Sequence, residues 1–211
     1  MNSDKFYFIF ISFWVLGSCK TDQKPNIPGD YWDSNLNKIS YYIPKDFQLV
    51  DILDEQIFLS YASTITNGKL KQKIKEDRLS FSVYPETQNF IYFSKEDSSN
   101  YTNIYISEIP YIRINDLIVD YFKKYRDDAF YASNRKNDSL KITLNAENFI
   151  NKPHYQLVYS DVKISTSLDT LYLSQYITSK YYQTFIIETE STEKFNFYPY
   201  LKETKFNART N

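Results

Sequence analysis

Cys19 is the side chain best suited by type and position to covalent chemistry, because it is the only cysteine among the 211 residues. It follows Leu16, Gly17 and Ser18, at the point where a largely apolar run over residues 6–17 gives way to polar sequence. A thiol is the only side chain in this stretch that can form a thioether, and the two small residues before it fit a narrow peptidase subsite. We therefore predict that the chain is cut before Cys19 and that the thiol is acylated.

The segment that leads to Cys19 has the length of a secretory signal. Its apolar run is shorter than the roughly 20 residues that cross a bilayer. Residues 16–19 resemble a bacterial lipobox, which implies a lipoprotein signal peptide over 1–18 and acyl chains such as palmitate on Cys19. Two or more chains would make attachment to the membrane durable. An ordinary secretory signal, or a start that is not cleaved, is the alternative.

The implied location is the cell envelope of a bacterium. The polar start over residues 20–24 resembles the charged export signals of some Bacteroidetes lipoproteins. This resemblance implies a lipid anchor in the outer membrane, with the protein facing the periplasm or the cell surface. Residues 19–38 contain Pro25, Pro28 and Gly29, and we expect a flexible tether there, with Tyr31 and Trp32 as its first contact with the domain.

The rest of the sequence has no group with the composition of a catalytic or metal site. His154 is the only histidine, so a zinc site would lack ligands, and we expect its ring at the surface or half-buried. The three glycines are too scattered for a phosphate-binding turn. Three adjacent carboxylate pairs are expected to be solvated: Glu76–Asp77, Glu96–Asp97 and Asp127–Asp128. We predict no metal and no cofactor, and we favour a binding role over an enzymatic one.

Charge and length limit the classes of partner and the number of domains. Lys and Arg number 25 and Asp and Glu 26, which gives no electrostatic case for nucleic acid. The length after the tether suits one domain, which we place at residues 39–211. A single cysteine excludes a disulfide within the chain.

Alternation and turn residues predict many strands and few helices. We expect strands at 39–43, 47–53, 56–62, 79–83, 89–94, 103–109, 140–144, 155–160, 170–178 and 181–189. Ser179 and Lys180 should form the turn between the last two strands, and residues 69–77 an exposed loop or a short helix. One strong helix is marked by an apolar stripe that should lie against a sheet: Leu117, Ile118, Tyr121, Phe122 and Tyr125. Asn115 or Asp116 caps this helix, and a short helix at 199–205 should pack back on the sheet.

One face of the strand at 170–178 is the most notable polar surface. It carries Thr170, Tyr172, Ser174, Tyr176 and Thr178. Tyrosine combines apolar area with a hydrogen-bonding tip, so this face is a possible platform for a glycan or a protein. The other interpretation is the solvated side of an antiparallel sheet, or a face covered by a helix with tyrosine hydroxyls at its rim.

Strands grouped around one strong helix and a short C-terminal helix favour an α+β fold with a mainly antiparallel sheet. The domain begins with residues 41–47, continues with the helix after the strand at 103–109 and ends with the hairpin at 170–189. This order of segments resembles the PsbP-like sandwich of bacterial envelope lipoproteins. The resemblance implies a binding or assembly role. Together with the anchor predicted at Cys19, it leads us to expect a membrane-anchored protein that acts as a binding or assembly module for an envelope protein or glycan. The alternative is a carboxylate-dependent glycan hydrolase or a glycan-binding protein.

Overall fold

The computed structural model describes residues 27–34, 39–51, 54–83, 90–97, 99–136, 140–167 and 169–206. Cys19 and the expected signal peptide lie outside the described residues. In chain order the elements are β1 (Gly29–Asp33), β2 (Ile39–Pro44), β3 (Gln48–Leu49), α1 (Glu55–Thr64), α2 (Gly68–Val83), β4 (Phe90–Asp97), β5 (Asn100–Ile109), α3 (Asp116–Lys136), β6 (Lys141–Lys152), β7 (Tyr155–Ser165), β8 (Thr170–Lys180), β9 (Gln183–Ser191), α4 (Tyr198–Glu203) and β10 (Lys205–Phe206).

The described strands form two antiparallel sheets. The large sheet has seven strands in the order β3-β4-β5-β9-β8-β7-β6, and the small sheet has three in the order β1-β2-β10. Every strand pair in both sheets is antiparallel. The structure therefore confirms the predicted α+β class with a mainly antiparallel sheet.

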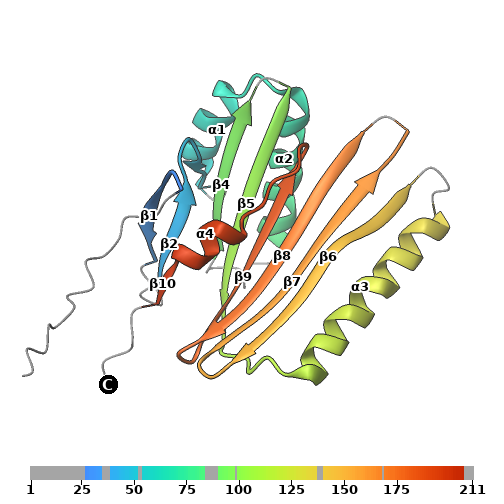
Figure 1. Ribbon diagram of the computed structural model, residues 1–211. Helices are drawn as coiled ribbons and strands as arrows, with labels where there is room; N and C mark the ends of the chain where they lie inside the picture. The colour runs from blue at the N-terminus through green and yellow to red at the C-terminus, as the bar shows by residue number, and fades with distance from the viewer. Residues whose placement is uncertain are drawn as a thin grey trace, which may run out of the picture.

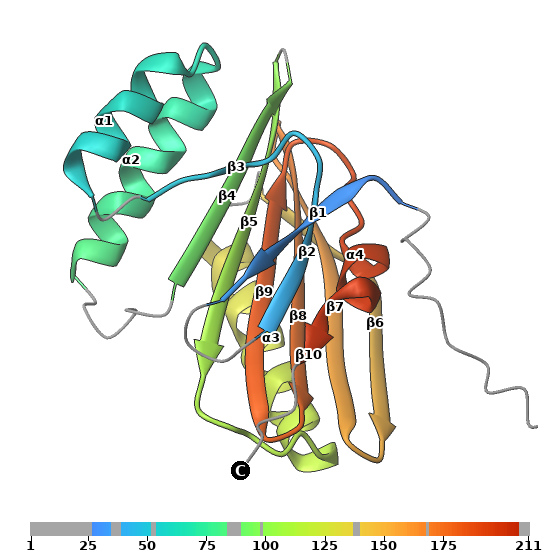
Figure 2. The same cartoon turned by 90° about the vertical axis from the view of Figure 1, so that its left-hand side faces the viewer.

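The large sheet is the middle layer of a sandwich (Figures 1 and 2). Successive side chains of a strand point to opposite faces, and β5 shows what covers each face. Ile104 and Ile106 point to the small sheet and α4, whereas Tyr101 and Tyr105 point to α1 and α2. Helix α3 covers the same face as α1 and α2, but over β6 to β9, where Val119 packs in one cluster with side chains of those strands.

The largest apolar cluster lies between the two sheets. Its largest fully buried rings are those of Tyr41, Tyr176, Phe185 and Phe197. The Tyr41 and Phe185 rings meet edge to face with their centroids 5.2 Å apart. The Tyr41 hydroxyl donates a hydrogen bond to Oε1 of buried Glu108 at 2.8 Å, which gives this polar group a partner inside the core.

Two predicted strands, at 56–62 and 79–83, are wrong: both segments are helical, in α1 and α2. The Asp54 carboxylate accepts a hydrogen bond from the Ile57 N–H at 2.9 Å and caps α1. Leu70 and Ile74, the buried apolar residues in the described part of α2, are four apart, which is the spacing of one helix face. The alternation over 79–83 falls at the C-terminal end of a 16-residue helix, where Leu79 is exposed.

Helix α3 was predicted correctly in position but only in part in its buried face. The Asn115 side chain accepts a hydrogen bond from the Ile118 N–H at 3.0 Å, as expected for the cap. Leu117 is 75% exposed and Tyr121 64%, whereas Val119 is buried. The helix thus lies on the sheet through Val119 and through Ile118 and Phe122 of the predicted stripe.

Two other expectations need correction. Residues 29–33, assigned to the tether, form β1, which pairs with β2 over its whole length. A Cβ at Gly29 would lie 2.7 Å from the Ile43 carbonyl oxygen and from the Tyr42 ring, so this close approach requires glycine. The turn between β8 and β9 is at Tyr181 and Tyr182, two residues later than predicted.

Most other predicted elements are confirmed. The structure has strands at 39–44, 90–97, 100–109, 141–152 and 155–165. The expected C-terminal helix is α4, and its buried residue Leu201 belongs to the cluster between the sheets. Among the described residues, no helix is both long and apolar enough to cross a membrane.

Candidate functional site

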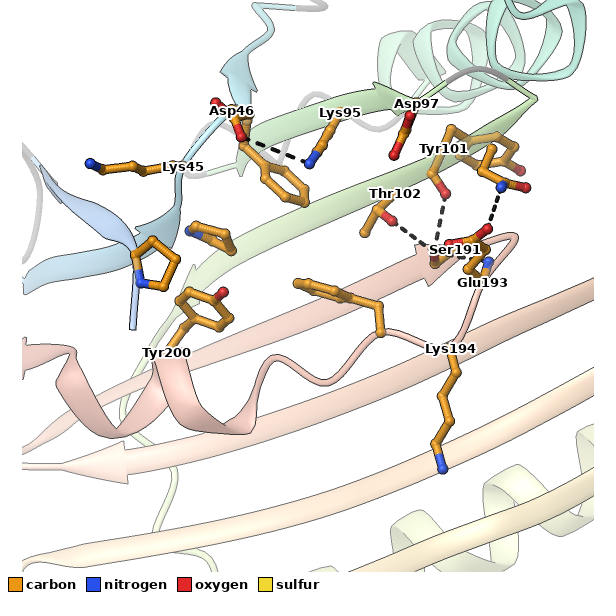
Figure 3. A pocket seen from close by; sticks show the side chains of 15 residues that line it. Lys45, Asp46, Lys95, Asp97, Tyr101, Thr102, Ser191, Glu193, Lys194 and Tyr200 are labelled. Carbon is orange, nitrogen blue, oxygen red and sulfur yellow. Dashed lines mark hydrogen bonds and ion pairs between the residues drawn. The ribbon is translucent and has the colours of Figure 1, made fainter. Parts of the chain in front are cut away.

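A cleft of about 380 Å³ opens where the small sheet and α4 meet the ends of β4, β5 and β9 (Figure 3). Its lining comes from five stretches that are far apart in the sequence, namely 28, 44–47, 95–102, 191–195 and 200. Pro28, just before β1, lines one edge of this cleft, and residues 193–195, just after β9, line another. The fold therefore builds the cleft from the junction of its two sheets.

Aromatic rings form one side of the cleft. The Phe47 and Phe195 rings have centroids 5.9 Å apart, and Phe195 lies 6.4 Å from the stacked ring of Tyr200. All three rings are partly buried and rest on the cluster between the sheets. Their position is therefore fixed by the core, while their outer edges line the opening.

Charged and hydroxyl groups form the other side. Lys95 Nζ lies 3.9 Å from Asp46 Oδ2, and Glu193 accepts a hydrogen bond from the Asn100 amide. The Thr102 and Ser191 hydroxyl oxygens are 2.7 Å apart and share a hydrogen bond. Figure 3 shows these groups gathered around the mouth of the cleft, with Lys194 extending away from it.

A tight turn places two of the charged residues. Asp46 follows the end of β2 with a left-handed φ of 70°, a conformation that Asp tolerates better than most residues. The Lys45 N–H donates a hydrogen bond to the Pro28 carbonyl at 3.5 Å, which ties the turn to the start of the domain. The turn thus brings Asp46 within reach of Lys95 on β4.

A second polar group, the ionic cluster, lies buried on the other face of the large sheet. Lys73 Nζ contacts Asp77 Oδ1 at 2.9 Å and Glu190 Oε2 at 3.0 Å. The Tyr105 hydroxyl donates to Asp77 at 2.8 Å and the Tyr101 hydroxyl donates to Glu190 at 3.0 Å. These contacts join α2 to β5 and β9.

Burial and pairing set the protonation of the ionic cluster. Burial raises the pKa of Glu190, and the attraction of Lys73 only partly offsets this. Burial disfavours the charged form of Lys73, but Glu190 and Asp77 outweigh it and raise the pKa of Lys73. Burial also raises the pKa values of Tyr101 and Tyr105, so both hydroxyls remain hydrogen-bond donors. The charged and hydroxyl groups of the ionic cluster contact one another, and we interpret the cluster as the attachment of α2 to the sheet.

The predicted platform on β8 is not an open surface. Thr170, Tyr172, Ser174, Tyr176 and Thr178 lie on β8 as expected, but Ser174, Tyr176 and Thr178 are buried. The Tyr176 ring stacks on Tyr159 at 4.8 Å and packs against Phe197, because the segment that leads into α4 covers this part of the sheet. Thr170 and Tyr172 are partly exposed. The interpretation as a face covered by other elements therefore fits three of the five residues.

The other residues singled out in the sequence lie in different places. His154 is exposed in the turn between β6 and β7. Asp77, expected to be solvated, is buried in the ionic cluster, while Asp127 and Asp128 are exposed as expected. Glu96 accepts hydrogen bonds from the Thr66 and Asn67 N–H groups. In the described part of the chain, no group of three or more His, Cys, Asp or Glu side chains is arranged to hold a metal ion.

Sequence reasoning missed the cleft because its lining has no shared motif. Two signals were present: Pro44-Lys45-Asp46 marks a turn, and residues 193–198 mix charge with aromatic rings. Neither signal shows that the two segments meet, since β2 and β9 belong to different sheets. The contact depends on the packing of the sheets against each other.

No family model and no curated protein matches this chain. Among solved structures, the chain is similar to the solution structure of cyanobacterial PsbP (CyanoP) from Synechocystis sp. PCC 6803. The two share 12% sequence identity with a TM-score of 0.45, over 89% of this chain and 92% of the other.

Proposed function

We propose that this chain is a lipid-anchored protein of the bacterial cell envelope that binds or assembles other envelope components. The anchor is supported by the sequence of residues 16–19, in which Cys19 follows an apolar run and two small residues. The binding role is supported by the cleft of Figure 3, which is the observation that carries the proposal. The cleft lies beside Pro28, so the bound component would sit close to the point where the tether joins the domain.

The lining of the cleft favours a partner with both apolar and charged groups, such as an extended protein segment. Phe47 and Phe195 offer fixed apolar area, which is the kind of surface that dominates binding energy. The cleft also carries charges of both signs, on Lys95, Asp97 and Glu193. Such a mixture favours specificity for one partner over general electrostatic attraction.

A charge reversal in the cleft tests this role. Asp97→Lys changes an exposed residue of the cleft, and Asp120→Lys makes the same change on an exposed position of α3 as a matched control. Each full-length lipoprotein is purified with mild detergent from its own membrane, and the co-purified proteins are quantified by mass spectrometry. We expect a partner retained by wild type and Asp120→Lys to be reduced about tenfold with Asp97→Lys. Equal retention by both variants would show that the cleft is not the binding site.

The alternative is a carboxylate-dependent glycan hydrolase or a glycan-binding protein. Asp97 and Glu193 line the same cleft, and this is the observation that favours it. A glycosidase requires two carboxyl groups on either side of the scissile bond. Hydrolysis of an envelope polysaccharide by wild type that both Asp97→Asn and Glu193→Gln abolish would support the alternative and contradict a purely binding role.

A further inference from the structure

A second hollow, which we call the hairpin-end site, lies where β6 turns into β7 and β8 into β9 (Figure 2). Its volume is about 740 Å³, and five aromatic rings line it: the half-buried ring of Tyr155 and four exposed rings, Tyr111, His154, Tyr181 and Tyr182. The Tyr111 and Tyr182 rings meet edge to face at 5.4 Å, and His154 stacks on Tyr181 at 6.4 Å. The site and the cleft lie at opposite ends of β9, so they are separate.

Of the exposed rings, three sit on a left-handed backbone. Tyr182 is 77% exposed, Tyr111 44% and Tyr181 43%. The φ angles are 63° at His154, 50° at Tyr181 and 61° at Tyr182. A two-residue hairpin turn with positive φ at both positions favours Asn and Gly, and bulky side chains there are strained. The chain therefore keeps large rings where folding alone would favour small residues, which indicates a role for the rings in binding.

The charge of the hairpin-end site is positive. Arg113, Lys152 and Lys180 line it, and among its described lining residues none is Asp or Glu. The whole chain is almost neutral, with 25 basic and 26 acidic residues, so this is a local concentration of positive charge. Such a hollow attracts anionic groups and repels cationic ones.

We propose that the hairpin-end site binds an anionic polysaccharide. Sugar rings present flat C–H faces that pack on aromatic rings, and their carboxylate or phosphate substituents pair with Lys and Arg. The hollow shape suits a polymer chain better than the flat surface of a membrane.

Affinity electrophoresis of the detergent-solubilised full chain tests the proposal, with polygalacturonate as the anionic probe and dextran as the neutral one. Tyr182→Gly removes the most exposed ring and places glycine at a left-handed φ, so the turn is retained or stabilised. Lys152→Glu reverses one charge of the site. Tyr121→Ala and Lys141→Glu, at exposed positions away from the site, are the matched controls.

We expect polygalacturonate, but not dextran, to retard wild type and both controls, with weaker retardation at higher salt. Tyr182→Gly and Lys152→Glu should each weaken the apparent affinity about tenfold. The proposal would be overturned by no retardation of wild type, or by equal retardation of site and control variants. Binding to phosphatidylglycerol vesicles that the same two variants lose, without binding to polygalacturonate, would instead identify a lipid surface. The Asp97→Lys test concerns the other end of β9, so failure there is distinguishable from failure here.

Discussion

Lys73 is the residue that shows most clearly what the sequence could and could not predict. Asp77 lies four residues after Lys73, so their ion pair on one helix face follows from the sequence once α2 is recognised. The contact of Lys73 with Glu190 and the hydrogen bond from Tyr105 to Asp77 join residues far apart in the chain. Both depend on how α2 lies on the sheet. Asp77 was therefore expected in solvent but is buried. Removing one member of such a buried pair leaves an uncompensated charge.

Glu190→Gln tests the protonation of the ionic cluster. Burial raises the folded-state pKa of Glu190 above 4.5, so the folded state holds this proton more tightly than the unfolded state. The contribution of Glu190 to stability therefore falls as pH rises from about 4.5 through the raised pKa. We expect the unfolding free energy of wild type, measured in urea relative to Glu190→Gln, to decrease as pH is raised from about 4 to about 7.

Glu188→Gln, at an exposed position on the same strand, is the control for this measurement. The decrease expected for Glu190→Gln should not appear in this comparison, because Glu188 lies outside the ionic cluster. A wild-type stability that rises with pH relative to Glu190→Gln would show that the ion pair with Lys73 outweighs burial.

At the scale of elements, the α1–α2 hairpin was the main failure of the sequence prediction. The short apolar runs at 56–62 and 79–83 fit either a strand or a helix, and alternation alone did not distinguish them. The capping residues favour the helix in both segments. Asp54 caps the start of α1, and the Asn67 side chain accepts hydrogen bonds from the Lys69 and Leu70 N–H groups at the start of α2. Strands of the large sheet were predicted better because their alternation extends over more residues.

Glu96→Ala tests how the α1–α2 hairpin is held on the sheet. The Glu96 carboxylate on β4 accepts hydrogen bonds from the Thr66 and Asn67 N–H groups in the loop between the two helices. We expect the substitution to increase amide hydrogen exchange in α1 and α2, with little change in α3. Glu188→Ala is the control on the same sheet. Equal exchange in α1 and α2 of wild type and Glu96→Ala would show that the apolar contacts and the ionic cluster hold the helices without Glu96.

The same contact gives a pH dependence to this part of the structure. Desolvation opposes ionisation of Glu96, but the hydrogen bonds from Thr66 and Asn67 outweigh it and lower the pKa of Glu96. A lowered folded-state pKa means that this stabilisation is present above pH of about 4.5 and is lost as pH falls through the folded-state value. We therefore expect lower protection of the α1 and α2 amides of wild type at acid pH, measured relative to the intrinsic exchange rate at each pH, and Glu96→Ala should not show this loss.

At the scale of the whole molecule, the sequence predicted the class but not the assembly. Apolar alternation and a single strong helix led to an α+β sandwich with an antiparallel sheet, and the structure has that architecture. The sequence did not indicate that β1 and β10 pair with β2 in a separate sheet, because each of them forms only a short strand. The cleft and the hairpin-end site both arise from this assembly. Their residues lie on several elements that only the folded chain brings together.

Mass spectrometry of the mature amino terminus, purified from its native membrane, tests most directly whether the folded domain is tied to a membrane through Cys19. We predict a chain that begins at Cys19 and carries acyl chains on that residue, which a Cys19→Ala variant lacks. An unmodified amino terminus at any other residue would contradict the anchor and, with it, the proposed place of this protein in the cell envelope.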